Sequence, residues 1–271
     1  MGNMGAKIRR IPTYIEGLDE EIEGGIPEGF VNLISGVTGT MKSSIAFNII
    51  YNEALKGKNS LYISIEQPFN NFSMQLSSLN IDLSKINVAI AHFSGTRLNY
   101  ISKGKKSMGT IVFLDVPSAR YRIMKAKKFG DLVTTISTLI NELQKRLYCQ
   151  YLVLDSLNAL YAISNIKNPR ETLFNMFEFF RSKNLTSYLI LEVSSDKRTH
   201  DQYIVENYLA DSIIFLDLAR YGRIVQREIS IAKMRATKSN VNIFTLTFED
   251  GRFKAILGGK TPIVEFDERS L

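Results

Sequence analysis

Short runs of apolar residues alternate along the chain with segments whose apolar positions recur every three or four residues. The short runs are typical of buried strands, and the longer period is typical of amphipathic helices. Continuous apolarity, as in YLILEV at 188–193, suits strands that are covered on both faces. The alternation predicts an α/β fold with a mostly parallel central sheet flanked by helices. The expected strands are residues 30–35, 60–65, 87–91, 110–116, 151–154, 187–193 and 212–218.

Two expected helices carry clear apolar stripes. One contains Leu132, Ile136, Leu139, Ile140, Leu143 and Leu147, and the other contains Leu173, Met176, Phe177 and Phe180. This spacing places each set on one face of a helix. We interpret both stripes as core packing.

The pattern changes after residue 218. Residues 224–233 alternate between apolar and polar, and a second strand-like run at 242–248 leads into a Glu-Asp-Gly turn. Such alternation predicts antiparallel strands at the C-terminal edge of the sheet. We found no repeat or linker, so we expect one domain over residues 1–271, with a core at about 11–250 and a C-terminal extension at 251–271.

Composition narrows the class of protein. The chain has 271 residues, 45% of them apolar and 23% charged, which excludes disordered and collagen-like compositions. Its single cysteine, Cys149, cannot form an internal disulfide, so a reducing compartment is expected. No apolar run approaches the roughly 18 residues of a membrane helix. These features predict a cytoplasmic protein that does not bind membranes.

The strongest candidate site is a glycine-bearing loop between the strand at 30–35 and a helix expected from about 43 to 55. Strand, loop and helix in this order form the context of a phosphate-binding P-loop. Backbone N–H groups in the loop and at the helix N-terminus would face phosphates. Lys42 would reach the β- and γ-phosphates, and Ser43 would bind Mg²⁺. The candidate nucleotide-binding residues are Gly36, Val37, Thr38, Gly39, Thr40, Met41, Lys42, Ser43 and Ser44.

Met41 departs from the P-loop pattern, which usually has a second glycine at this position. A side chain fits there if the residue adopts the right-handed helical conformation. It is costly if φ must be positive.

Two carboxylates follow predicted strands and belong near the phosphates, because open α/β sheets bind ligands at the carboxyl ends of their strands. Asp155 ends the apolar YLVL run and is a candidate Mg²⁺ ligand, although Asp155 or Ser156 could instead cap the following helix. Glu66 follows the strand at 60–65 and is a candidate to orient and deprotonate the attacking water. The alternative for Glu66 is also a helix cap, since Pro68 and a helical run follow.

Together these motifs resemble the RecA-superfamily ATPases, and among them the KaiC-like proteins. The lead-in IPTYIEGLDEEIEGGIPEG at 11–29 is similar to that family's, as are Ser-Ile-Glu at 64–66, Leu-Asp-Ser at 154–156 and the segment at 205–215. The resemblance spans about residues 11–250, with the motifs in the family's order. It implies a RecA-like ATPase fold, ATP and Mg²⁺ as ligands, and Glu66 as the catalytic carboxylate.

The segment IAKMRAT at 231–237 resembles the family's KMRG[ST] signature, with Ala236 in place of the usual glycine. Lys233 and Arg235 are two residues apart on an expected strand and so share one face. They could be charges on a solvated edge strand. The resemblance implies instead that they contact the γ-phosphate of a neighbouring subunit, as an arginine finger does. It therefore implies self-association in a ring, with a hexamer as the expected form.

The sequence leaves several functions open. Glu66 is followed by Gln67, where many relatives have a second acid, and this with Met41 fits a nucleotide-gated binding module with little hydrolysis. No site matches the paired phosphorylated residues of KaiC, so an autokinase role is not expected. A third alternative is a recombinase paralogue that acts on DNA.

The positive charge is concentrated in one segment. The whole chain has a net charge of +7, whereas residues 97–128 carry nine basic residues and one acid, which leaves −1 for the remainder. Such a segment can bind a nucleic acid backbone or an acidic protein partner, and it can equally be a solvated hairpin. It lies outside the loops at about 161–170 and 194–206, which correspond to the DNA-contacting loops of recombinases.

Overall fold

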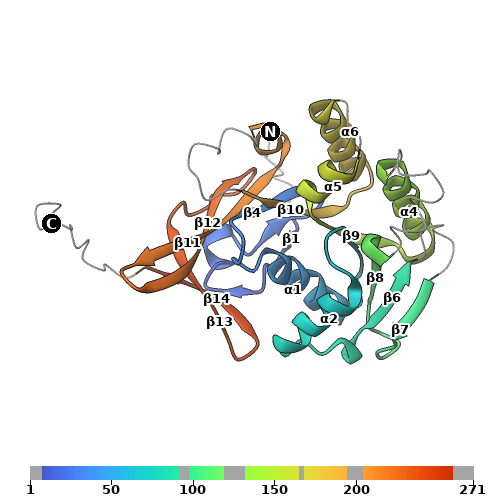
Figure 1. Ribbon diagram of the computed structural model, residues 1–271, viewed down its shortest axis with the longest axis horizontal. Coiled ribbons are helices and arrows are strands. Elements are labelled where there is room, and N and C mark those ends of the chain that lie inside the picture. The colour runs from blue at the N-terminus through green and yellow to red at the C-terminus, as the bar shows by residue number, and fades with distance from the viewer. Residues whose placement is uncertain (1–7, 92–97, 119–131, 165–167, 194–203, 259–271) are drawn as a thin grey trace, which may run out of the picture.

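The computed structural model describes residues 8–91, 98–118, 132–164, 168–193 and 204–258. A twelve-stranded sheet runs through the molecule in the order β2-β14-β13-β12-β11-β4-β10-β9-β5-β8-β6-β7, and β1 and β3 form a separate two-stranded sheet (Figure 1). The strands are β1 Arg10–Ile11, β2 Ile15–Glu16, β3 Ile26–Pro27, β4 Val31–Gly36, β5 Asn59–Ser64, β6 Asn87–Ala91, β7 Leu98–Ser102, β8 Thr110–Asp115, β9 Cys149–Asp155, β10 Thr186–Glu192, β11 Ser212–Tyr221, β12 Ile224–Met234, β13 Ile243–Glu249 and β14 Arg252–Leu257. The α-helices are α1 Lys42–Leu55, α2 Phe69–Ser78, α4 Leu132–Leu147, α5 Leu157–Ile163, α6 Pro169–Ser182 and α7 Ile204–Leu209.

The centre of the sheet is parallel, as the apolar runs predict. Strands β11, β4, β10, β9, β5, β8 and β6 pair in parallel. Their register places Gly36 at the end of β4 beside Glu192 at the end of β10. It likewise places Ser64 of β5 beside Asp155 of β9. The carboxyl ends of four strands therefore meet at one edge.

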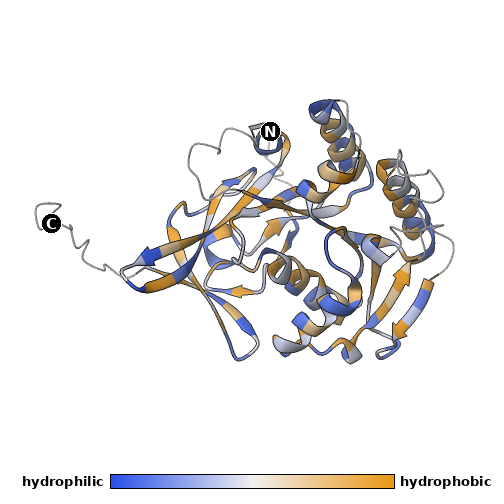
Figure 2. Cartoon of the chain, in the orientation of Figure 1, coloured by the Kyte–Doolittle hydropathy of each residue, from blue (hydrophilic) through white to orange (hydrophobic). Residues whose placement is uncertain are grey.

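Helices cover both faces of this parallel region. On one face, α1 and α2 pack on a core that includes Phe47, Phe72 and Phe113. On the other face, α4, α5 and α6 bury both predicted apolar stripes, with Ile140 and Phe177 at their centres. In Figure 2, α4 and α6 carry both orange and blue. Both stripes are core packing, as interpreted from the sequence.

The C-terminal strands form the expected antiparallel edge. β11 pairs with β12, β12 with β13, and β13 with β14, all antiparallel. β14, which the sequence pattern did not predict, lies between β13 and the short N-terminal strand β2. The sheet thus extends to Leu257, and it connects the N-terminal lead-in to the C-terminal strands.

The opposite edge of the sheet is an antiparallel hairpin, in which β7 pairs with β6. The sequence analysis did not identify β7. Within the described ranges, no helix is long and apolar enough to span a membrane.

Candidate functional site

The predicted phosphate loop joins the central strand β4 to helix α1, which begins at Lys42. Gly36 is required where β4 ends, because a Cβ atom there would lie 2.2 Å from the carbonyl oxygen of Leu216 on β11. Gly39 adopts a φ of +85°, a conformation that L side chains rarely adopt. The loop is thus packed against its neighbouring strand at one end and turned by glycine in the middle.

Met41 adopts the costly one of its two alternatives. Its φ is +69° and its ψ is +26°, in the left-handed region, immediately before the first residue of α1. A non-glycine residue pays about 1–2 kcal/mol for this conformation. Its side chain is partly buried and packs on the core beneath α1 and α2, which offsets part of that cost.

Lys42 lies over the loop that it follows. Its Nζ donates hydrogen bonds to the carbonyl oxygens of Gly36 at 2.9 Å and Val37 at 2.8 Å. Burial lowers the pKa of Lys42, and the nearby carboxylates of Glu192, Asp155 and Glu66 oppose this shift. The ammonium group is therefore held among carbonyl and carboxylate oxygens at the start of the helix.

A cavity of about 270 Å³ opens at this place. It brings together predicted residues from three segments: the phosphate loop, Glu66 after β5, and Asp155 at the end of β9. Four other predicted loop residues line no part of it. Gly36 and Val37 hold Lys42, while Thr40 and Ser44 are fully buried. The lining residues are Thr38, Gly39, Met41, Lys42, Ser43, Glu66, Gln75, Asp155, Ser156, Ile190 and Glu192.

Asp155 is held by two hydroxyl groups. Tyr62 on β5 donates to its Oδ2 at 2.6 Å, and Ser43 also hydrogen-bonds to this carboxylate. Burial raises the pKa of Asp155, while these two hydrogen bonds lower it. Burial also keeps the pKa of Tyr62 far above its ordinary value, so the phenol remains a donor. Ser43 and Asp155 thus lie side by side, as the sequence predicts for two ligands of one cation.

The helix-cap alternatives are decided by the hydrogen bonds. Ser156 caps α5, since its Oγ accepts from the N–H of Ala159 at 3.2 Å, while Asp155 faces the cavity. Helix α2 is capped by Asp115 of β8, whose Oδ2 accepts from the N–H of Phe69 at 2.9 Å. Glu66 caps neither helix. It is exposed at the cavity, where its carboxylate accepts a hydrogen bond from Ser156.

The sequence analysis missed the cavity residues Gln75, Ile190 and Glu192, and it missed Tyr62, which lies outside the cavity lining and hydrogen-bonds to Asp155. Tyr62 lies inside an apolar run, where it reads as core. Gln75 comes from α2, and its side chain donates to Ser44 at 3.1 Å. Glu192 ends β10 as Asp155 ends β9, so the same strand-end signal was present in the sequence.

The donor set suits a hard divalent cation. Ser43 and Asp155 supply hydroxyl and carboxylate oxygens, and Mg²⁺ in nucleotide sites takes one or two protein ligands and fills its other positions with water and phosphate. In the part of the chain that the structure describes, no group of three or more His, Cys, Asp or Glu residues is arranged to hold a metal by itself. The two oxygen donors of Ser43 and Asp155 fit a cation whose other positions are filled by phosphates and water.

Lys233 and Arg235 lie away from this cavity. Lys233 is near the end of β12, and Arg235 follows in the turn after Met234. Met234 is level with Ser212 of β11 and, through it, with Asn32 of β4. Gly36 is four residues farther along β4, which is about 13 Å at the usual rise of a strand. The two residues are thus near the other end of the sheet from their own phosphate loop.

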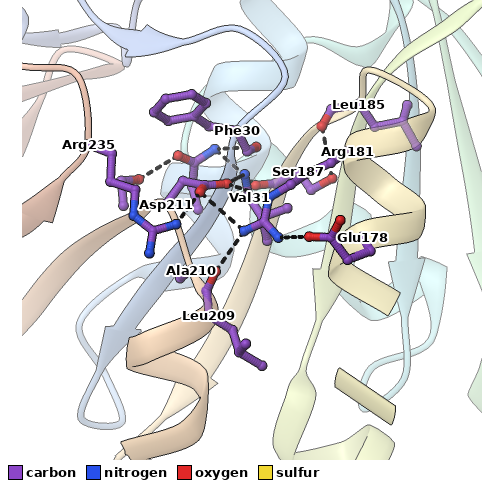
Figure 3. Close-up of polar contacts among 12 residues, drawn as sticks. Phe30, Val31, Glu178, Arg181, Leu185, Ser187, Leu209, Ala210, Asp211 and Arg235 are labelled. Carbon is purple, nitrogen blue, oxygen red and sulfur yellow. Dashed lines mark hydrogen bonds and ion pairs between the residues drawn. The ribbon is translucent and has the colours of Figure 1, made fainter. Parts of the chain in front are cut away.

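Arg235 belongs to a charge cluster around Asp211, which is 6% exposed (Figure 3). Asp211 accepts from Arg235 Nη1 at 2.8 Å, from Arg181 at 3.1 Å and from the N–H of Val31 at 3.0 Å. Lys233 lies nearby, and its Nζ donates to backbone carbonyls at the end of α7, the shortest at 2.7 Å to Ala210. Lys233 and Arg235 are therefore both oriented by the segment at the end of α7 and the start of β11.

The basic segment is described only in part. Lys103, Lys105 and Lys106 follow β7, whereas Arg97 and the five basic residues from Arg120 to Lys128 lie outside the described residues. Most of the candidate DNA-contacting loops, including residues 165–167 and 194–203, also lies outside them. The nucleic acid hypothesis stays a prediction from the sequence.

The left-handed conformation of Met41 predicts a measurable backbone strain. Met41→Ala removes the packing and keeps the Cβ atom, whereas Met41→Gly removes both. We expect the glycine variant to be about 1 kcal/mol more stable than the alanine variant, since glycine tolerates positive φ. Denaturant unfolding of the two variants measures this difference. Equal stability, or a more stable alanine variant, would show that position 41 is not strained.

Comparison with known proteins is consistent with this geometry. The sequence model of the family described as "ATPase: KaiC" matches residues 11–256. A UPF0273 protein of Saccharolobus solfataricus is 29% identical over 231 residues, which cover 85% of this chain and 77% of that protein. A UPF0273 protein of Thermotoga maritima is 28% identical over 240 residues, which cover 86% and 90% of the two chains.

Two further similarities are more distant. The circadian clock protein KaiC3 of Synechocystis is 22% identical over 89% of this chain, and the match covers 44% of that longer protein. The crystal structure of a KaiC-like protein from Pyrococcus horikoshii shares the fold, with a TM-score of 0.68 and 23% identity over 92% of this chain and 99% of that one. Since the family match covers nearly the whole chain, this protein belongs to the KaiC family of RecA-like ATPases.

Proposed function

We propose that this chain binds ATP with Mg²⁺ in the cavity at the end of β4 and hydrolyses the nucleotide. The observation that carries the proposal is the convergence of Lys42, Ser43, Glu66 and Asp155 on one cavity, from three separate strand ends. Each has the chemistry that phosphoryl transfer requires of its position: a cation for phosphates, two oxygen ligands for a metal, and a base for water. We propose that the chain forms a single RecA-like domain, which supplies all four of these residues.

The phosphates would occupy the space beside residues 36–44. Lys42 then exchanges its two carbonyl partners for phosphate oxygens, which carry more negative charge. Ser43 and Asp155 would hold Mg²⁺, which would supply positive charge to stabilise the transferring phosphate. Tyr62 acts as a positioning residue, because its hydrogen bond fixes the orientation of the Asp155 carboxylate.

Glu66 is the proposed base. It is exposed at the cavity, and the hydroxyl of Ser156 orients its carboxylate. Glu66 accepts a proton from water as the water oxygen attacks the γ-phosphorus. The bond from that phosphorus to the bridging oxygen of the β-phosphate then breaks, and ADP and phosphate are the products.

Lys233 and Arg235 would act on the site of a neighbouring copy. Their position near the other end of the sheet supports this, because it removes them from their own phosphate loop. Arg235 remains 51% exposed despite its bond to Asp211, so part of its guanidinium is accessible to another chain. We therefore propose self-association in a ring in which each subunit completes its neighbour's site, with the released energy driving a conformational cycle.

The competing function is nucleotide binding with little turnover. It is favoured by the strained Met41 and by Gln67, which leaves Glu66 as the single carboxylate after β5. Under this alternative, the chain would recruit a partner in its nucleotide-bound form.

Substitutions in the cavity separate these functions. Lys42→Ala should abolish nucleotide binding, since it removes the cation that faces the phosphates. Glu66→Gln should retain binding and lower the single-turnover rate of hydrolysis by 100-fold or more, in the range of about 10²–10⁴ that a general base contributes.

The matched control is Lys145→Ala, which removes an exposed lysine on α4. Unchanged binding in Lys42→Ala would contradict the site assignment. Equal single-turnover rates in wild type and Glu66→Gln would favour the binding module.

A mixing experiment tests the shared site. Arg235→Ala keeps its own cavity but lacks the arginine, whereas Lys42→Ala keeps the arginine but lacks the cavity. Each alone should be inactive, and their mixture should recover part of the wild-type hydrolysis, because one type of interface is then complete. ATPase rates and mass photometry with Mg-ATP measure activity and assembly together.

Arg252→Ala, on the exposed part of β14, is the control for loss of an arginine. Full activity of Arg235→Ala on its own, or co-assembly of the two inactive variants without recovery, would refute the shared site.

A further inference from the structure

Glu192 is a third carboxylate in the nucleotide cavity, and the proposed reaction does not use it. It ends β10, the strand that lies between β4 and β9. The parallel register places it directly beside Gly36, at the start of the phosphate loop. It thus lies on the loop side of the cavity, whereas Asp155 and Glu66 approach from β9 and β5.

Hydrogen bonds fix both the backbone and the side chain of Glu192. Its backbone N–H donates to Asn158 Oδ1 at 2.7 Å, and its carbonyl oxygen accepts from Asn158 Nδ2 at 3.0 Å. Its carboxylate accepts a hydrogen bond from the hydroxyl of Thr38, a residue of the phosphate loop. Both Thr38 and Glu192 line the cavity, so this bond is part of the wall that phosphates would face.

The charges in the cavity are unbalanced. Among its lining residues, all in the described part of the chain, Lys42 is the one basic residue, against the carboxylates of Glu66, Asp155 and Glu192. Of these three carboxylates, Glu192 raises the pKa of Lys42 the most. Asp155 has a cation to bind and Glu66 has water to activate, but Glu192 is bound to the loop itself.

A carboxylate at this position is expected to affect the affinity for a nucleoside triphosphate more than the affinity for a diphosphate. An ionised carboxylate accepts hydrogen bonds and donates none, so it offers nothing to a phosphate oxygen. In the proposed binding mode, the third phosphate would bring additional negative charge to the space around Thr38 and Lys42. The carboxylate of Glu192 would repel this charge. A diphosphate, which lacks this group, leaves the contacts of Glu192 in place.

We propose that Glu192 is a specificity-determining residue that makes this site favour nucleoside diphosphates over nucleoside triphosphates. The inference rests on the proposed function, since it concerns the same cavity. Triphosphate binding requires the bond between Thr38 and Glu192 to open, and diphosphate binding does not. After hydrolysis the same carboxylate favours retention of the diphosphate product.

A different role for Glu192 would have the opposite effect on triphosphate affinity. If a divalent cation bridged Glu192 to the third phosphate, the carboxylate would strengthen triphosphate binding. One variant separates the two, because Glu192→Gln keeps the size of the side chain and removes its charge.

The experiment is calorimetric titration of wild type and variants with ADP and with a non-hydrolysable ATP analogue, each with Mg²⁺. We expect Glu192→Gln to bind the triphosphate about tenfold more tightly than wild type, which corresponds to about 1.4 kcal/mol. Its affinity for ADP should change by less than about threefold. Glu192→Asp, which keeps the charge, should retain the wild-type preference for diphosphate. Glu249→Gln removes an acid at the end of β13, outside the cavity, and should match wild type.

The outcomes are distinguishable. If wild type binds neither nucleotide, the proposed function fails and the inference fails with it. If wild type binds both, but Glu192→Gln leaves the ratio of the two affinities unchanged, the inference alone is overturned. Weaker triphosphate binding in Glu192→Gln would overturn it in favour of the bridging cation.

Discussion

The parallel register of β4, β10, β9 and β5 is the constraint on which the candidate site depends. It sets the phosphate loop, Glu192, Asp155 and Glu66 at one edge of the sheet, although these residues are separated by up to 156 positions in the chain. A shift of one residue in any of these pairs would turn its terminal side chain to the other face. Side chains from both faces of these strands pack against helices in two separate cores, and this packing constrains the register.

The same sheet orients charged groups at its other end. Asp211 precedes β11 and binds both Arg181 of α6 and Arg235 after β12, which secures the turn that carries the KMR residues. Because β11 pairs directly with β4, this cluster and the phosphate loop lie near opposite ends of the same part of the sheet. The candidate nucleotide site and the two basic residues are therefore separated along the sheet. That geometry supports the proposal of sites shared between neighbouring copies.

Much of the fold could be read from the sequence, because its signals are local. All the strands expected from 30–35 to 242–248 are present, and so are the helices from Lys42, after Pro68 and at the two apolar stripes. The loop between β4 and α1 was equally readable from its glycines, and its role in phosphate binding stays a prediction. β14 and β7 were missed, although they are as long as some predicted strands, because they lie at or near an edge of the sheet, where burial imposes less pattern.

The remaining details of the site depend on non-local contacts. Tyr62 became part of it through Asp155, which lies 93 positions later, and Asp115 caps a helix that begins 46 positions before it. The backbone conformation of Met41 follows from the path of the loop, and the residue type alone left both alternatives open. Glu192 was recognisable as a strand end, but its contact with Thr38 depends on which strands are neighbours.

The most direct measurement is a crystal structure of the chain with Mg²⁺ and a non-hydrolysable ATP analogue. The account predicts phosphates against residues 36–44, with Lys42 Nζ on phosphate oxygens in place of the Gly36 and Val37 carbonyls. It also predicts Mg²⁺ on Ser43, beside Asp155. A nucleotide bound elsewhere, or Lys42 still on its two carbonyl partners with the phosphates out of reach, would contradict it.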